Sequence, residues 1–180
     1  SNTSYHAADV ALYEGEIITE FYTTNTTSNT FYISNYDIDT TSVTVKVRTS
    51  NTDNSNTEWT RANSLFGVTS TSNVFFVQAA ANGSYELVFG NDTFGRKLTD
   101  GNIVEATYRI ASGSDPDGAG IFTAAGSISG YSSITVDTTT RAAGGQEYQT
   151  LDDIKFAAPR ALSTQERAVT ANDYKILVEN

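Results

Sequence analysis

The sequence contains no cysteine and no methionine, and it has one histidine, one tryptophan and two prolines in 180 residues. Without cysteine there is no disulfide framework, no thiolate metal site and no cysteine nucleophile. The missing methionine fits a fragment that lacks its native start, so we expect the chain to be part of a longer protein. Long apolar runs are also missing, since no window approaches the roughly 20 apolar residues of a membrane span. We therefore expect no membrane insertion.

Positive charge is scarce. The chain has 11 Lys and Arg against 21 Asp and Glu, which gives a formal net charge of −10 and an isoelectric point near 4.4. Nucleic-acid binding normally needs a basic stripe that attracts phosphates. The composition thus predicts that nucleic acid is not a partner.

Thr, Ser, Asn and Gly are abundant instead, together with ten Tyr and nine Phe. These residues are typical of strand surfaces, turns and half-buried sheets. Apolar and polar residues alternate with the period of a strand in several segments. The predicted strands are 12–22, 42–49, 73–77, 85–89, 104–110 and a short one at Ile134–Val136. Asn82-Gly83, after the third of these, predicts a hairpin turn.

The last thirty residues have a different pattern. Three Ser/Thr-x-x-Asp/Glu signatures, each able to cap a helix start, begin at Thr150, Ser163 and Thr170. They predict short helices over about 151–157, 165–168 and 171–178, the first of them stopped by Pro159. The fold class expected is therefore mainly β with short C-terminal helices, built on an antiparallel, sandwich-like domain. Residues 1–149 would form the β-rich domain, and 150–180 a helical segment leading into a further domain.

A stretch in the middle of the chain resembles a known motif. An aromatic strand runs into Phe89-Gly90-Asn91-Asp92, a second turn follows with Gly95, a third with Gly101, and the next strand ends at Tyr108-Arg109. This is similar to the central motif of the baseplate J-like family, the wedge proteins of contractile phage tails. The family's turn reads Phe-Gly-Asp-Gly, so Asp92 stands in place of its second glycine.

A second block extends the resemblance toward the C-terminus. It comprises Gly144-Gly145, then residues 154–160 ending in Ala-Pro-Arg, then Arg167-Ala-Val-Thr leading to Asp173-Tyr174. Together the matching segments span roughly 35–178, and they most resemble the larger wedge subunit of the long-tailed myophages.

The resemblance implies a structural role without a catalytic site, cofactor or metal. Such a protein would assemble around the tail axis with copies of itself and neighbouring wedge subunits as a homo-oligomer, and relay the contraction signal. It would fold in the host cytoplasm and reside in the tail baseplate of the virion. The residues expected at its interfaces are Arg96, Lys97, Arg160, Arg167, Asp173 and Tyr174.

Enzymatic alternatives have less support in the sequence. A Ser-His-acid site would have to use His6, which lies in a polar segment with few residues to orient it. Glu14, Glu16 and Glu20 repeat at a spacing of two, so a strand would put them on one face, where two acids could hydrolyse a glycosidic bond. Acids along an edge strand are more often a solvated surface that discourages edge pairing.

Three loops suggest ligands less directly. Residues 51–56 and 115–118 are rich in oxygen ligands for Ca²⁺, but their spacing differs from the helix-loop-helix calcium pattern. The glycines of 90–95 could suggest a phosphate cradle, although a strand rather than a helix is expected to follow. The competing function is a carbohydrate- or receptor-binding tail adhesin, since acidic, Thr-rich β domains with exposed aromatics suit that task.

Overall fold

The computed structural model describes residues 4–25, 28–81 and 83–147, together with Asp152, Asp153, Lys155, Phe156 and Ala158. Seven strands make up its regular structure. They are β1 (Glu16–Thr23), β2 (Thr30–Tyr32), β3 (Ile38–Arg48), β4 (Thr57–Arg61), β5 (Val74–Ala79), β6 (Tyr85–Phe89) and β7 (Ile103–Ile110). The chain divides into two compact units, Ser1–Ser112 and Gly113–Asn180, and all seven strands lie in the first.

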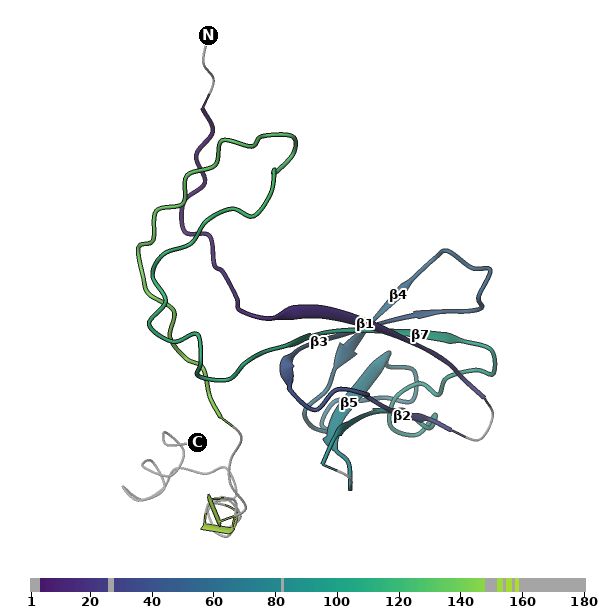
Figure 1. The fold of residues 1–180 in the computed structure, drawn as a ribbon. Helices are drawn as coiled ribbons and strands as arrows, with labels where there is room; N and C mark the ends of the chain where they lie inside the picture. Colours follow the sequence, from purple (N-terminus) through teal and green to yellow (C-terminus); the bar gives the residue numbers. More distant parts are fainter. Residues whose placement is uncertain are drawn as a thin grey trace. The chain divides into compact units, whose positions relative to one another are not determined.

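The strands form one sheet in the order β1-β7-β3-β4-β5-β6-β2, which curls into a nearly closed, barrel-like arrangement (Figure 1). All neighbours are antiparallel except β4 and β5, which are parallel. The β-rich prediction is confirmed, but the predicted antiparallel sandwich is wrong. Alternation shows that one face of each strand is buried, and a sheet closing on itself produces the same pattern as two stacked sheets.

The interior is filled by alternate residues of the strands and by aromatic rings. Val45 of β3 and Val104 and Tyr108 of β7 are 0% exposed. Trp59 packs edge-on against Phe89, with ring centroids 5.4 Å apart. The rest of the core comprises Ile33, Ile38, Val43, Val47, Phe75, Leu87, Leu98, Ile103 and Ala106. Burial of these side chains is the main force that curls the sheet, because each inward face needs an apolar partner.

β1 and β2, the two ends of the strand order, meet through side chains. The Glu20 carboxylate accepts hydrogen bonds from the hydroxyls of Tyr22 and Ser34, and from the buried Tyr108 hydroxyl at 2.8 Å. The Tyr22 ring also packs on Phe31 of β2, 5.2 Å between centroids. We call this contact the seam. In a fully closed barrel, β1 and β2 would pair through backbone hydrogen bonds. Here side-chain hydrogen bonds join this region instead.

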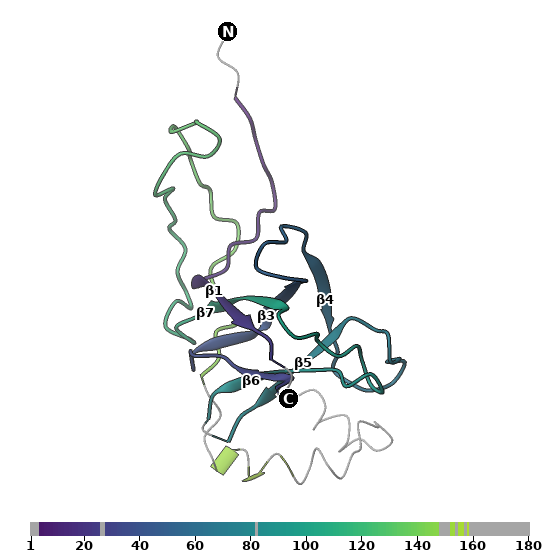
Figure 2. The same cartoon turned by 90° about the vertical axis from the view of Figure 1, so that its right-hand side faces the viewer.

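The hairpin predicted at Asn82-Gly83 is confirmed, because β5 and β6 pair as consecutive antiparallel strands (Figure 2). The amide of Ala80 donates to the Ser84 carbonyl at 2.8 Å, which closes the connection. Gly83 has a φ of +84°, a conformation that glycine adopts without steric cost. Local turn chemistry was therefore a reliable guide at this position.

The described part of the second unit, residues 113–147, contains no strand, so the one predicted at Ile134–Val136 is wrong. Two apolar residues at a spacing of two do not form a strand without a partner to complete the ladder. Two segments are nevertheless joined: Gly118 N donates to Ala142 O, and Ala142 N donates to Ala119 O, both at 2.8 Å. The predicted boundary between 149 and 150 lies outside the described residues and stays a prediction.

The predicted fold class also included three short C-terminal helices, and this part of the prediction is wrong. No helix is among the elements of the described part of the chain, which are all strands. Asp152, Asp153, Lys155, Phe156 and Ala158 have helical backbone, and the rest of 150–180 lies outside the described residues. Capping signatures arise easily in a Ser- and Thr-rich chain, and a short helix gains most of its stability from an apolar face packed on the core.

Among the described residues, no helical segment has the length and hydrophobicity needed to cross a membrane.

Candidate functional site

The turn after β6 belongs to the first of the two segments in which a family resemblance is expected, and its backbone is tightly constrained. A Cβ atom placed on the buried Gly90 would overlap the carbonyl group of Gly95 and lie 2.6 Å from its Cα. Asp92 has a φ of +65°, and its amide donates to Gly95 O at 2.9 Å. Asp and Asn tolerate this left-handed conformation better than most residues. Position 92 thus has the backbone conformation that the second glycine of the resembled motif would favour.

The same turn is not available as a phosphate cradle, because its amides already have acceptors. The amides of Thr93 and Phe94 donate to the Asn91 side chain at 3.1 and 3.0 Å. The amide of Gly95 donates to Thr69 O at 3.0 Å. A phosphate site needs amides that point to a free space. The phosphate interpretation is therefore not supported.

Beyond the turn, Arg96 and Lys97 lie beside a third cation that the sequence did not single out. Arg48, the last residue of β3, lines a hollow of about 170 Å³ with Arg96, Lys97 and Trp59. The amide of Arg96 donates to Ser72 O at 2.8 Å, so the segment is fixed at its backbone while both side chains stay exposed. We call Arg48, Arg96 and Lys97 the basic rim.

Arg48 also lines a larger hollow of about 580 Å³ together with Phe21, Asn51 and Ile103. Its guanidinium lies over the Phe21 ring, 5.7 Å from the centroid, which is within cation–π range. Phe21 itself is 58% exposed. The two hollows therefore share one arginine and combine apolar walls with positive charge.

The side chains of the basic rim have no described carboxylate partner in the two hollows, although the Asp92 carboxylate accepts a hydrogen bond from the Lys97 amide at 2.9 Å. Among the described residues, neither hollow is lined by a carboxylate, and the ion pairs involve other residues. The Nε atom of Arg48 is buried and has no hydrogen-bond acceptor. A buried donor left without an acceptor costs about 1–3 kcal/mol.

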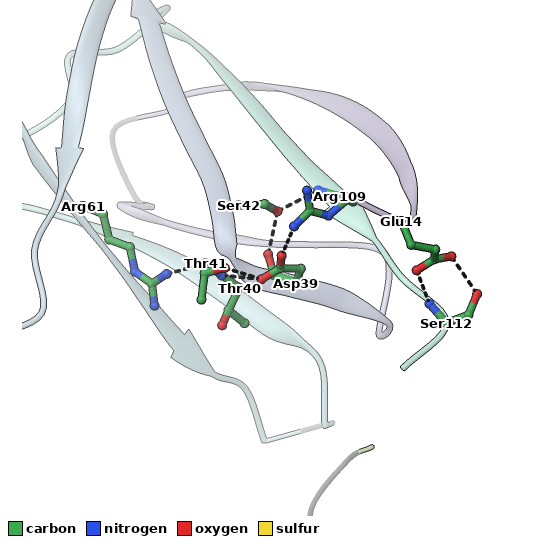
Figure 3. Close-up of polar contacts among 8 residues, drawn as sticks. All are labelled: Glu14, Asp39, Thr40, Thr41, Ser42, Arg61, Arg109 and Ser112. Carbon is green, nitrogen blue, oxygen red and sulfur yellow. Dashed lines mark hydrogen bonds and ion pairs between the residues drawn. The ribbon is translucent and has the colours of Figure 1, made fainter. Parts of the chain in front are cut away.

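A second charged cluster lies where β3 bulges against β7 (Figure 3). Arg109 forms an ion pair with Asp39, and its amide donates to the Ser42 hydroxyl at 2.9 Å. Arg61 donates to the carbonyl of Thr40 inside the bulge. Burial acts to raise the pKa of Asp39, but hydrogen bonds from Thr41 and Arg109 lower it below its usual value. The side-chain hydrogen bonds of Asp39, Ser42 and Arg109 lie within the cluster, and of its described side-chain atoms only the Nε atom of Arg61 is buried without an acceptor. The cluster is therefore structural: it holds the bulge.

Replacing Arg109 by Met should destabilise the barrel by about 1 kcal/mol at neutral pH, because the half-buried Asp39 loses its charge partner. The Asp39 pKa is lowered in the folded state, so the ion pair stabilises above the unfolded-state pKa and its contribution is lost as the pH falls. Urea unfolding at pH 7 and pH 3 measures both effects. Lys46→Met, on the exposed face of β3, is the matched control, with an expected change within about 0.5 kcal/mol. Equal destabilisation by the two variants would contradict the interpretation.

The three glutamates proposed for a glycosidase, Glu14, Glu16 and Glu20, have different surroundings and share no hydrogen-bond partner among the bonds of the described residues. Glu14 accepts hydrogen bonds from the amide and hydroxyl of Ser112 at 3.0 and 3.1 Å (Figure 3). Glu16 is exposed, and Glu20 lies in the seam. Burial acts to raise the pKa of Glu20, but hydrogen bonds from Ser34, Tyr22 and Tyr108 lower it. The general acid of a glycosidase needs a raised pKa, whereas the pKa of Glu20 is lowered, so Glu20 does not fit that role.

The other candidate chemistry is equally local. His6 is exposed and lies 3.5 Å from the Ser4 hydroxyl. In the loop 51–56 the Asp53 carboxylate accepts hydrogen bonds from the Thr49 and Ser55 hydroxyls, which stabilise a turn. In the loop 115–118, Asp117 accepts from the Gly145 amide at 3.1 Å. Within the described residues, no group of three or more His, Asp or Glu is placed to hold a metal ion.

Of the predicted interface residues, the structure places Arg96 and Lys97 at one rim. Arg160, Arg167, Asp173 and Tyr174 lie outside the described residues. The residue that sequence reasoning missed is Arg48, which lies within the strand predicted at 42–49 and was not expected at an interface. Its position beside the loop 49–56 was the available signal, since strand ends often carry binding residues.

The strands from residue 16 to residue 110 thus form a nearly closed, barrel-like β-sheet domain with a basic rim. No protein-family model matches the chain, and neither a curated protein nor a solved structure shows significant similarity to it.

Proposed function

We propose that this protein is a structural component of a contractile-tail baseplate wedge, in which the barrel-like domain holds segments that contact neighbouring subunits. The resemblance of residues 85–109 to the baseplate J-like motif supports this proposal. So does the φ of +65° at Asp92, where that motif has a glycine. The role would be mechanical, with copies of the chain and other wedge subunits as partners in the tail of the virion.

The observation that best supports an assembly role is the exposure of large apolar side chains outside the strands. Every residue from 4 to 15, before β1, is exposed, including Tyr5 at 74%, Leu12 at 62% and Tyr13 at 72%. Phe66 is 96% exposed in the loop between β4 and β5. An extended segment that buries little of its own surface gains stability from a partner, and exposed apolar groups of this kind mark interaction surfaces.

The second unit has the same character. Its described residues include Ile121 at 92% exposure, Ile128 at 65% and Tyr131 at 56%. Backbone hydrogen bonds near Gly118 and Ala142 hold two of its segments together, while more than half of the surface of each of these side chains is exposed. Covering them in an oligomer would contribute about 25 cal/mol for each Å² of apolar surface removed from water.

The test is to locate the protein in tailed particles of its source with a gold-labelled antibody raised against the barrel unit. We expect label at the baseplate only, on intact particles or on particles opened to expose it. An antibody against a sheath protein, labelling the length of the tail, controls for access. Label confined to fibre tips would contradict the proposal and favour the adhesin alternative. Absence of label on opened particles would contradict a virion role altogether.

A further inference from the structure

We propose that the basic rim is a binding site for an acidic peptide segment of another protein chain, with Arg48 as its central residue. This inference concerns the groove at Arg48, Arg96 and Lys97, and does not depend on the baseplate proposal. Its starting point is the distribution of charge. In a chain with 21 acidic and 11 basic residues, three bases meet where, among the described residues, no acid lines the hollows. Like charges gathered in a concave surface focus the field on an incoming anion.

The orientation of the Arg48 side chain is fixed before any ligand binds. The Arg48 guanidinium is held over the Phe21 ring, 5.7 Å from the centroid, and the residue lines both hollows. A guanidinium fixed in this way presents parallel N–H groups, and a carboxylate matches that geometry with two hydrogen bonds. The ring contact orients the side chain in advance, so little conformational entropy is lost when a ligand binds. Arg48 is thus prepared for a planar anion.

The third step is shape. The two hollows, about 170 and 580 Å³, share Arg48 and are bordered by the same two loops, around 49–51 and 99–102. A single small anion would occupy only a part of this space. Phe21 and Ile103 supply apolar walls in the larger hollow, and Trp59 borders the smaller one. Alternate acidic and apolar side chains of an extended peptide fit this combination, because neighbouring side chains of an extended chain point to opposite sides.

Net charge argues against a nucleic acid in the same groove. A polyphosphate carries closely spaced charges and requires a continuous basic stripe, whereas the rim offers three cations on a chain of net charge −10. A peptide with a few carboxylates places its charges only where the cations lie. The occupant we infer is therefore an acidic segment of a partner protein.

The experiment uses the whole chain and a fluorescein-labelled peptide of alternating aspartate and leucine, with binding followed by fluorescence anisotropy. The matched peptide has asparagine at every aspartate position. We expect the aspartate peptide to bind at least about tenfold more tightly than the asparagine peptide, and to weaken as salt is raised. The Arg96→Ala/Lys97→Ala double variant and the Arg48→Met variant should each lose about tenfold in affinity.

Lys46→Ala is the matched control, because Lys46 is exposed on β3 two residues before Arg48 and lines neither hollow. It should change affinity by less than about twofold. Arg48→Lys keeps the charge without the planar fork, and an intermediate loss is expected. Trp59 emission verifies that each variant is folded, since this residue is the one tryptophan and is 6% exposed.

Three outcomes would overturn the inference. The first is no binding of the aspartate peptide at roughly 1 mM. The second is equal binding of both peptides, or an equal loss on Lys46→Ala, which would indicate non-specific attraction. The third is complete displacement of the peptide by about 10 mM inorganic phosphate, since a site for small anions would then explain the charge cluster.

Discussion

Replacing Gly90 by alanine should destabilise the barrel domain by about 3 kcal/mol, the largest effect we expect from adding a single carbon atom. The backbone φ of Gly90 is not in the left-handed region, so the cause is space alone: the new Cβ would overlap the Gly95 carbonyl group. The backbones of Gly90 and Gly95 lie against each other across the turn. The overlapping atoms are backbone atoms, so the clash cannot be relieved by rotating a side chain. Urea unfolding followed by Trp59 emission measures the change.

Two other glycines provide matched controls. Gly101 has open space around its Cβ position but a φ of +82°, so Gly101→Ala should cost only the dihedral strain, about 1 kcal/mol. Gly126 has open space and no positive φ, and Gly126→Ala should leave barrel unfolding unchanged. We therefore predict that the loss of stability decreases in the order Gly90→Ala, Gly101→Ala, Gly126→Ala. A Gly90→Ala variant as stable as the Gly126→Ala variant would show that the turn opens at little cost.

Replacing Glu20 by alanine should open the seam and destabilise the domain by about 2–3 kcal/mol. The change removes the acceptor of the Tyr22, Ser34 and Tyr108 hydroxyls at once. Burial raises the pKa of Tyr108 to about 12, with the Glu20 carboxylate acting in the same direction and a hydrogen bond from Asn35 against it. The Tyr108 hydroxyl therefore stays protonated and would lose a charged acceptor. Glu20→Gln keeps the shape, and about half of the loss is expected.

The pH dependence distinguishes this charge effect from simple packing. Hydrogen bonds lower the Glu20 pKa in the folded state below the ordinary 4.5, even though burial opposes them. The carboxylate therefore stabilises the fold above about pH 4.5, and its contribution is lost as the pH falls through the folded-state pKa. The stability difference between the natural chain and Glu20→Gln should be constant from pH 8 to about pH 5 and shrink toward pH 3. A difference independent of pH would mean that shape, and not charge, closes the seam.

Where neighbouring residues decide the conformation, the sequence predicted the fold well. β6 runs from Tyr85 to Phe89 as predicted, and the hairpin before it was recognised from Asn82-Gly83. The strand predicted at 42–49 extends back to Ile38, because the bulge between Asp39 and Thr44 interrupts the alternation on which the prediction relied. A bulge depends on its partner strand, and the pattern within one strand does not reveal it.

The candidate site divides in the same way. Arg96 and Lys97 were expected at an interface from the sequence, and the structure places them in the lining of one hollow. Arg48 is separated from them by almost fifty positions, and only the pairing of β3 with β4 and β7 brings it to the same rim. From its spacing in the sequence, Glu20 was grouped with Glu14 and Glu16 as one of three acids on a strand face. In the folded domain its carboxylate instead accepts the hydrogen bonds that close the seam.

The sequence by itself determined the β-rich character, the excess of negative charge, the absence of cysteine chemistry and the positions of the glycine turns, because each depends on residue type and near neighbours. Only the tertiary structure decided that one sheet curls on itself and that β4 and β5 run parallel. It also decided that three cations share a hollow that no described carboxylate lines. Those features depend on contacts between residues distant in the chain. Their free energies arise from burial and pairing that no local pattern encodes.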